Sequence, residues 1–418
     1  MKNITSLGPL AAFQVRSFRF QWPADLLTSW AMEMETLILG WYILVETGSV
    51  LLLTLFGSLQ FLGTLVAPMF GVFGDRVGRR AMMCSMRAFM TLLAAIIMVL
   101  GFLEILSVIQ VFVIAVLNGL VRPSDLVMRH ALIGDTMPGA RLANALGLSR
   151  ATMDTARIIG ALSGAGLFSF LGIGFAYMAV AAFYLISFAF TLGVSAEHPA
   201  PEPAAGQTPD HSPDQSPRPT RWAELKDGLR LIRTTPALLA IMWLAFLVNV
   251  TAFPISHGLM PYVAREIYAV DENGLGQLVA GFATGALAGS IIMAVAGGRG
   301  RPGRTALFGI LGWYACLAVF IQFETKNAGF AVLMVMGVVH SFGMISMTVM
   351  LLHAVDARYR ARMMGVRMLA VYGLPIGLLA SGGLIEWIGF RATASIYISV
   401  GIVLTLVIAH RWRAAIWR

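Results

Sequence analysis

Long apolar segments recur along the whole chain and are separated by short polar connections. Of the 418 residues, 58% are hydrophobic and only 12% are charged, whereas about a quarter of a typical soluble domain is charged. About 20 consecutive apolar residues suffice for one membrane-spanning helix. The sequence therefore predicts an all-α membrane protein with twelve transmembrane helices, at residues 21–45, 50–73, 81–103, 107–132, 146–168, 172–194, 236–264, 275–298, 303–323, 328–353, 362–385 and 392–411.

Basic residues gather in every second connection between these predicted spans. Because positively charged loops stay on the cytoplasmic side of a membrane, the pattern predicts that both termini are cytoplasmic. It also explains the pI near 10 without a nucleic-acid partner. The basic clusters are Arg76/Arg79/Arg80, Arg129/Arg141, Arg218 to Arg233, Arg299/Arg301/Arg304, Arg358/Arg360/Arg362 and Arg411/Arg413/Arg418.

A proline-rich polar stretch divides the predicted spans into two sets of six. Residues 195–221 have too little apolar content to build a core, which is typical of a disordered linker. The following segment carries an apolar stripe around Trp222 and Leu225, and we expect a short helix on the membrane surface. The predicted domains are an N-terminal half (1–194), a cytoplasmic linker with this helix (195–235) and a C-terminal half (236–418). The linker is a passive tether or a regulatory element.

The two halves share small residues at one fixed offset. A shift of 217 residues places the fifth predicted span on the eleventh and matches five positions, as expected where two six-helix halves are parallel repeats. The matched pairs are Arg150/Arg367, Gly160/Gly377, Gly166/Gly383, Leu167/Leu384 and Gly172/Gly389.

A charged motif lies between the second and third predicted spans. It reads G-x-x-x-D-R-x-G-R-R and comprises Gly71, Asp75, Arg76, Gly78, Arg79 and Arg80. This motif resembles the signature of the major facilitator superfamily, whose members are alternating-access transporters. The resemblance implies that Asp75 and Arg76 latch one half against the other. It also implies that Gly78, Arg79 and Arg80 shape the turn and anchor it to lipid headgroups.

A narrower resemblance points to a subgroup of bacterial exporters that includes the enterobactin exporter and macrolide efflux pumps. It rests on Trp41-Tyr42, Thr47-Gly48-Ser49, Leu142 to Ala145 and Arg157 to Gly160. The resemblance implies efflux from the bacterial cytoplasm across the inner membrane. One departure is that Gly160 precedes Ala161, where many antiporters carry G-P-x-x-G-G.

The first predicted span contains two glutamates, and ionisable groups inside a span cost several kcal/mol and mark functional sites. Glu33 shares a helical face with Ser29 and Thr36, whereas Glu35 points the opposite way. In the superfamily, the first, fourth, seventh and tenth helices line the central cavity. Glu33 is therefore our preferred proton-coupling residue, with Glu35 as the second candidate.

Two further charge triads occupy the fourth and fifth predicted spans. Spacings of three and four residues place the members of each triad on one helical face. The triads either neutralise each other between neighbouring helices or provide charges for substrate and proton coupling. We expect Arg129 and Arg150 to reach lipid headgroups. The members are Arg122, Asp125 and Arg129 in the fourth span and Arg150, Asp154 and Arg157 in the fifth.

Polar residues in the second half are fewer. Asn249 lies in the seventh predicted span, which Pro254 is expected to kink near His257, and His340 lies centrally in the tenth. His340 is either a hydrogen-bonded core residue or a group that titrates near neutral pH. The middle of these two spans lacks acidic residues, so proton coupling is expected to depend on the N-terminal half.

Together these features predict a transporter that exports an amphipathic or lipophilic small molecule by proton antiport. The sequence contains no nucleotide-binding loop, metal-ligand cluster or nucleophile triad, so no enzyme activity or cofactor is predicted. The expected partners are the substrate, protons and membrane lipid, and we expect a monomer. The alternatives are a lysophospholipid flippase, an uncoupled facilitator and, from another class, a non-transporting membrane receptor.

Overall fold

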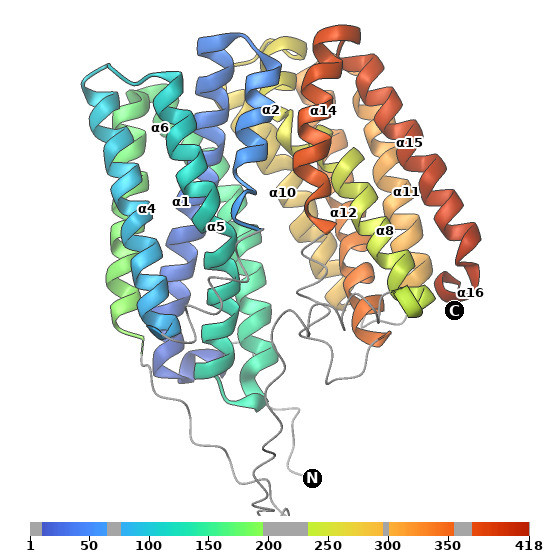
Figure 1. Ribbon diagram of the computed structural model, residues 1–418, viewed down its shortest axis with the longest axis horizontal. Helices are drawn as coiled ribbons and strands as arrows, with labels where there is room; N and C mark the ends of the chain where they lie inside the picture. The colour runs from blue at the N-terminus through green and yellow to red at the C-terminus, as the bar shows by residue number, and fades with distance from the viewer. Residues whose placement is uncertain (1–10, 65–76, 195–232, 296–300, 355–369, 418) are drawn as a thin grey trace, which may run out of the picture.

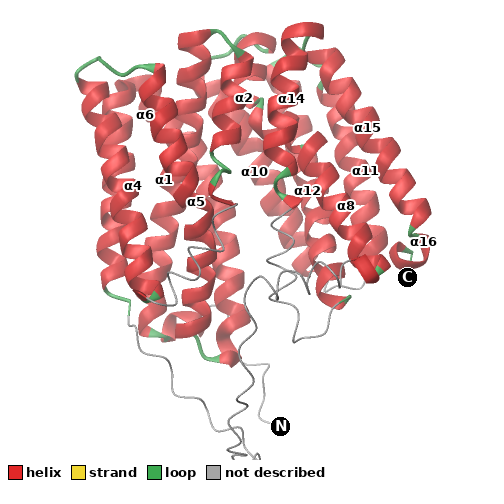
Figure 2. Cartoon of the chain, in the orientation of Figure 1, coloured by secondary structure: helices red, strands yellow, loops and turns green. Residues whose placement is uncertain are grey.

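The computed structural model of the chain describes residues 11–64, 77–194, 233–295, 301–354 and 370–417. Every regular element in these ranges is helical (Figure 2). Before residue 195 these are η2 (Ala11–Gln14), α1 (Arg16–Thr47), α2 (Val50–Leu59), α4 (Arg79–Phe102), α5 (Val108–Thr136) and α6 (Gly139–Leu192). After residue 232 they are α8 (Pro236–Thr251), η3 (Pro254–Gly258), α9 (Met260–Tyr262), η4 (Val263–Ile267), α10 (Glu272–Val295), α11 (Pro302–Phe320), α12 (Lys326–His353), α14 (Gly373–Ile388), α15 (Phe390–Arg411) and α16 (Arg413–Ile416).

The described helices agree with the predicted spans at most boundaries. Eight segments are long and apolar enough to cross a membrane, and one of them, Asn144–Leu192, covers two predicted spans. α1 has 32 residues but carries several charges, and the described parts of α2 and α14 are short. The count of twelve spans therefore stays a prediction, whereas an all-helical integral membrane protein is confirmed.

Glycine allows the chain to reverse between two predicted spans within α6. Gly172 has φ 80° and ψ 178°, which interrupts the helix and which residues with a Cβ rarely adopt. A contact of Arg80 with the Leu192 carbonyl and a close approach of Gly101 to Gly174 place the second part of α6 along α4. Gly389 has nearly the same conformation, φ 82° and ψ 167°. This shared turn supports the predicted repeat, in which Gly172 matches Gly389.

The predicted kink in the seventh span is confirmed. α8 ends at Thr251, and the chain then forms the π-helical turn η3 from Pro254 to Gly258, which includes His257. Proline lacks the amide hydrogen that an α-helix needs at this position.

The helices form two groups that lie side by side (Figure 1). α1, α2, α4, α5 and α6 make up one group, and α8 to α16 make up the other. The groups meet where α2 packs against α14 and where α6 packs against α10. In Figure 1 they are close at the top and further apart at the lower end, where α1 begins and α15 ends.

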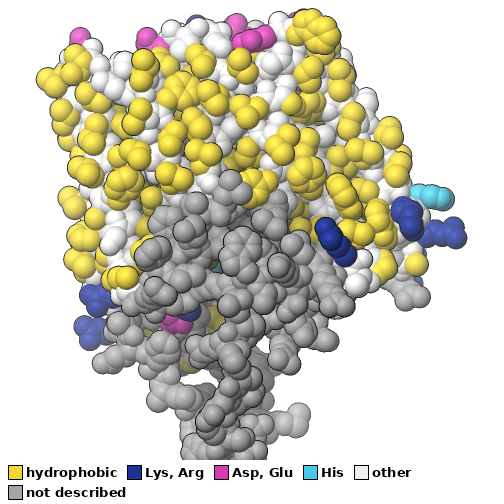
Figure 3. Space-filling model, viewed as in Figure 1, with side chains coloured by type: hydrophobic (Ala, Val, Ile, Leu, Met, Phe, Trp, Pro, Cys, Tyr) yellow, Lys and Arg dark blue, Asp and Glu magenta, His cyan; other side chains and the backbone are white. Residues whose placement is uncertain are grey.

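On the face shown in Figure 3, apolar side chains cover most of the described surface between the two ends. Large apolar side chains are exposed on α4, α5, α6, α10 and α15, among them Leu92, Ile109, Phe170, Ile291 and Val403. Acidic side chains gather at the upper rim of this view, and basic side chains gather mainly at the lower end. An apolar belt between two charged ends is the surface expected of a protein embedded in a bilayer.

Candidate functional site

Four buried charges from three helices form a closed network, which we call the charge network. Arg87 of α4 binds Asp25 of α1, and its Nε lies 3.5 Å from Asp125 of α5. Arg129 of α5 lies 2.8 Å from Asp125 and 3.4 Å from Asp25. All four side chains are almost completely buried. Each aspartate thus contacts both arginines, and the network carries no net charge.

Neighbouring hydroxyl groups complete the network. Arg129 donates to Ser29 at 2.7 Å, and Arg87 donates to Thr191 of α6. The charge network therefore joins α1, α4, α5 and α6, because every one of these helices supplies a member or a hydrogen-bond partner. Pairing with opposite charge offsets part of the cost of burying these groups in a low dielectric. Among the described residues, the buried Nε atoms of Arg87 and Arg129 have no hydrogen-bond acceptor.

The network corrects two predictions about the triads. The triads of α5 and α6 do not neutralise each other, because Asp125 and Arg129 pair with Asp25 and Arg87. Arg129 does not reach a headgroup region either, since its side chain is only 2% exposed. Helical spacing shows which residues share a face but not which neighbouring helix supplies the opposite charge.

Glu33 and Arg157 form a separate ion pair between α1 and α6. The Arg157 Nε lies 3.3 Å from Glu33, and the two side chains are 26% and 30% exposed. The helices approach closely here because Gly160 has no side chain: a Cβ at this position would lie 2.8 Å from the Glu33 Cβ. Glu33 is therefore a partly accessible carboxylate that pairs with Arg157.

The other two members of the α6 triad pair with each other. Arg150 lies 3.3 Å from Asp154 one helical turn away, and Arg150 is largely exposed while Asp154 is buried. In the part of the chain that the structure describes, this ion pair stays within α6.

Arg122 of α5 is bound by neutral groups. It donates to Gln60 at 2.6 Å, to Thr36 at 3.0 Å and to the Met32 carbonyl at 3.0 Å. Within the described ranges it forms no ion pair with a carboxylate. Arg122 consequently keeps a positive charge next to the helix that carries Glu33.

Glu35 points into the interior of its own helix group. It accepts hydrogen bonds from Asn118 of α5 at 2.8 Å and from Tyr184 of α6 at 3.1 Å, and it is 2% exposed. The opposite orientations predicted for Glu33 and Glu35 are thus present in the structure. Asn118 and Tyr184 were not singled out in the sequence, where a single amide and a single phenol give no pattern.

Aromatic side chains surround His340 in the second group. Trp313, Phe282 and Phe253 have ring centroids 4.6, 5.3 and 5.6 Å from that of His340, and His257 lies at 6.2 Å. Neither ring nitrogen of His340 has a hydrogen-bond partner among the described residues, contrary to the hypothesis of a hydrogen-bonded core histidine.

Asn249 of α8 is occupied within its own helix. It donates to the Ala245 carbonyl at 2.8 Å, and its Cβ lies next to Gly373 of α14. These contacts give Asn249 a packing position, and its predicted place in a substrate site is still a prediction.

The charged motif of residues 71–80, the predicted gate, lies partly within the described residues. Gly71, Asp75 and Arg76 lie outside the described residues. Gly78 has φ 96° and precedes α4, Arg79 pairs with Asp135 at the end of α5, and Arg80 donates to the Leu192 carbonyl. The two arginines therefore tie the start of α4 to the ends of α5 and α6.

A helical bundle with an apolar outer surface and paired charges inside defines a polytopic membrane protein, and buried charge of this kind is typical of transporters. The family model described as Major Facilitator Superfamily matches residues 22–371. The chain belongs to this superfamily and is a transporter rather than an enzyme.

Solved structures of transporters share this fold. A mutant of the nucleoside transporter NupG has a TM-score of 0.71 at 13% identity and covers 94% of this chain and 99% of its own. A D-xylose–proton symporter has a TM-score of 0.69 at 12% identity and covers 94% of this chain and 96% of its own. A bacterial homologue of the human lysosomal transporter Spinster, in an inward-facing and unoccupied conformation, has a TM-score of 0.67 at 14% identity and covers 96% of each chain. A search of curated proteins finds no match.

Proposed function

We propose that the protein exports an amphipathic or lipophilic small molecule across the bacterial inner membrane in exchange for protons. The observation that carries this proposal is the Glu33–Arg157 pair. Its two side chains are partly exposed and separated by 3.3 Å, and they come from two different helices. By contrast, the charge network is closed and buried, which suits a structural role.

The ionised Glu33 carboxylate can hold Arg157 or a positively charged or hydrogen-bond-donating group of the substrate. Protonation of Glu33 removes its charge and with it the attraction for that substrate group. Proton and substrate would therefore compete for Glu33, as antiport requires. Arg122 is held by the neutral groups Gln60 and Thr36, so its charge would be available to a polar group of the substrate.

α6, which carries Arg157, packs directly against the other helix group, because a Cβ at Gly276 of α10 would lie 2.8 Å from the Ala161 carbonyl oxygen of α6. The substrate would bind between Arg157 and the aromatic side chains around His340, which would contact its apolar part. Asp154 lies on α6 with Arg157, and Asn249 lies on α8 shortly before the turn that contains His257. Both stay candidates for this region.

The contacts between the groups define one conformation of a rocking cycle. At one end, Asn273 donates to Ser169 at 2.8 Å, Ser49 donates to Glu386 at 3.2 Å, and Arg265 binds the Leu44 carbonyl. The basic residues lie mainly at the opposite end (Figure 3). We infer that the basic end is cytoplasmic and that this conformation is closed on the outside. Asp75 and Arg76 would latch the cytoplasmic end in the alternate conformation.

Replacing Gly276 with leucine is expected to favour the alternate conformation. A Cβ at Gly276 of α10 would lie 2.6 Å from the Ala165 Cβ and 2.8 Å from the Ala161 carbonyl oxygen of α6, so a larger side chain must push the two helices apart. One spin label is placed near the Gly172 turn of α6 and the other near Glu272 at the start of α10, in a cysteine-free background. The distance between the two labels should increase in the variant.

Gly166→Leu is the matched control for this prediction. Nothing lies within 4 Å of a Cβ at Gly166, which is also on α6, so its distance distribution should equal that of the wild type. If Gly276→Leu and Gly166→Leu give the same distribution, the proposed closed end is wrong.

A thermal-shift screen of the purified protein tests the substrate class. The compounds are siderophores, macrolides, lipophilic dyes and lysophospholipids, and a ligand at about 100 times its Kd stabilises the folded state by roughly 2.7 kcal/mol. A stabilising compound whose effect disappears in Glu33→Gln or Arg122→Ala supports the proposed site. Stabilisation that survives in both variants places the site elsewhere.

The remaining alternatives predict different transport behaviour. A lysophospholipid flippase or an uncoupled facilitator would transport its substrate in proteoliposomes at a rate that protonophores do not change. A non-transporting receptor would bind a compound in the screen but would not move it across the bilayer.

A further inference from the structure

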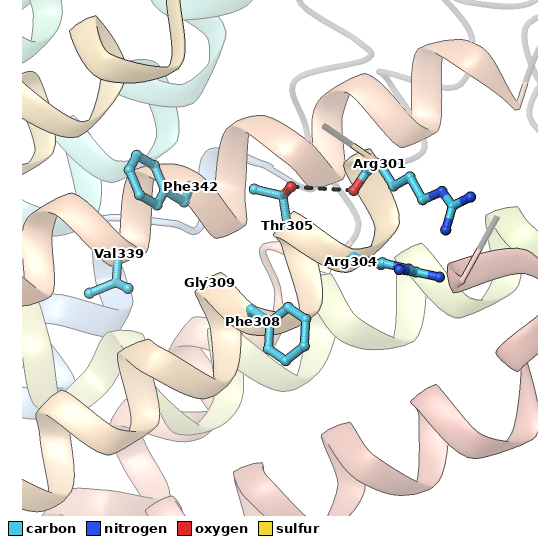
Figure 4. A pocket seen from close by; sticks show the side chains of 7 residues that line it. All are labelled: Arg301, Arg304, Thr305, Phe308, Gly309, Val339 and Phe342. Atoms are coloured by element: carbon cyan, nitrogen blue, oxygen red, sulfur yellow. Dashed lines mark hydrogen bonds between the residues drawn. The ribbon is translucent and has the colours of Figure 1, made fainter. Parts of the chain in front are cut away.

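A pocket on the outside of the second helix group lies away from the Glu33–Arg157 pair. It has a volume of about 530 Å³ and is formed by α11 and α12 near the basic end of the molecule. Its lining is polar at one end and apolar at the other. The polar end is formed by Arg301, Arg304 and Thr305, and the apolar end by Phe308, Val339 and Phe342 (Figure 4). The pocket is therefore amphipathic.

The polar end carries two arginines. Among the described residues, neither Arg301 nor Arg304 forms an ion pair. Arg304 stacks over the Trp417 ring at 5.3 Å, and its buried Nε has no hydrogen-bond acceptor. Two uncompensated guanidinium groups attract an anion, and guanidinium is suited to phosphate because its donors match the phosphate oxygens.

The start of α11 adds to this attraction. Arg301 is the N-cap and has an extended backbone, and no side chain caps the helix. The amide groups of the first turn and the helix dipole therefore favour negative charge at the same end. α16 holds this end in place, because Gly303 packs directly against the Ile416 carbonyl.

The apolar end opens onto the outer surface. The Phe308 side chain is 60% exposed, and α11 is one of the segments apolar enough to cross a membrane. Gly309 and Gly343 bring α11 and α12 into backbone contact beneath it. In a bilayer this surface meets acyl chains, so a ligand whose phosphate lies at the arginines can extend its chains along Phe308 and Phe342.

We propose that this pocket binds the headgroup of an acidic phospholipid. The phosphodiester would contact the guanidinium groups of Arg301 and Arg304, and the acyl chains would cover the apolar end. The Thr305 hydroxyl donates to the Arg301 carbonyl at 3.3 Å (Figure 4). A zwitterionic lipid fits less well, because its ammonium group would lie beside two arginines, and no carboxylate is among the residues that line the pocket. The proposal does not depend on the transported substrate.

Native mass spectrometry of the full-length protein in detergent tests this assignment, with dioleoylphosphatidylglycerol and dioleoylphosphatidylcholine as probes. We expect the wild type to bind phosphatidylglycerol at least about tenfold more tightly, since each arginine near an anionic headgroup contributes on the order of a several-fold effect. The double variant Arg301→Gln/Arg304→Gln should bind both lipids equally.

Arg411→Gln is the control, because Arg411 is an exposed arginine at the end of α15 that does not line the pocket. It should keep the wild-type preference. If the double variant does not fold, Arg301→Gln alone should reduce the preference, since the Arg301 side chain is exposed. Equal binding of both lipids by the wild type, or an unchanged preference in the arginine variants, would overturn the proposal.

Inorganic phosphate distinguishes a lipid headgroup from a free anion. Displacement of phosphatidylglycerol by excess phosphate supports recognition through the phosphate group. Wild-type protein that binds inorganic phosphate but shows no preference between the lipids would overturn the assignment to a lipid.

Discussion

Replacing Arg87 with alanine is expected to lower the free energy of unfolding by about 3–5 kcal/mol, because it leaves buried carboxylates without adequate compensation. In the wild type, Asp25 and Asp125 each contact both Arg87 and Arg129. Without Arg87, two negative charges share one positive charge in a site that water does not reach. Thermal and denaturant unfolding of the detergent-solubilised variant measures the loss.

Removal of Asp25 together with Arg87 should restore part of this stability. The double variant Asp25→Ala/Arg87→Ala keeps the neutral Asp125–Arg129 pair, so its loss should be smaller than the sum of the two single losses. If the loss of unfolding free energy in the double variant equals the sum of the two single losses, the four residues do not form one coupled network.

An exposed ion pair provides the comparison. Arg391 binds Glu324 at 2.6 Å, but the two side chains are 56% and 69% exposed. Arg391→Ala should change the free energy of unfolding by at most about 1 kcal/mol, since solvent screens such pairs. If Arg87→Ala is no more harmful than Arg391→Ala, burial does not determine the importance of the network.

Replacing Glu33 with glutamine is expected to abolish transport driven by a pH gradient. Glutamine has nearly the shape of a protonated glutamate but cannot exchange a proton, so Arg157 would lose its charged partner permanently. In proteoliposomes, a compound identified by the binding screen should move down its own gradient, while an imposed pH gradient should no longer increase its rate.

Glu35→Gln is the matched control, two residues away on the same helix. Glu35 is buried between Asn118 and Tyr184, so we expect this variant to keep its response to the pH gradient even if it unfolds more easily. Loss of coupling in Glu35→Gln but not in Glu33→Gln would assign proton coupling to the buried glutamate and contradict our proposal.

Some site features followed from the sequence because they depend on one helix only. The opposite directions of Glu33 and Glu35 follow from helical geometry, and the interruption near His257 follows from Pro254. The hydrogen-bond partners of the site residues could not be predicted from the sequence. Gln60, Asn118 and Tyr184 bind Arg122 and Glu35 from other helices, and no spacing rule relates them.

The sequence by itself determined that this is a helical membrane transporter of the major facilitator type. Apolar length, the basic connections and the motif ending at Arg80 are local properties, and the bilayer imposes them on each segment separately. Only the tertiary structure decided which charges neutralise one another. Asp25 and Arg87 are far apart in the chain, and they meet because α1, α4 and α5 pack together. That packing buries one set of charges as a network and leaves Glu33 with Arg157 as a partly exposed pair.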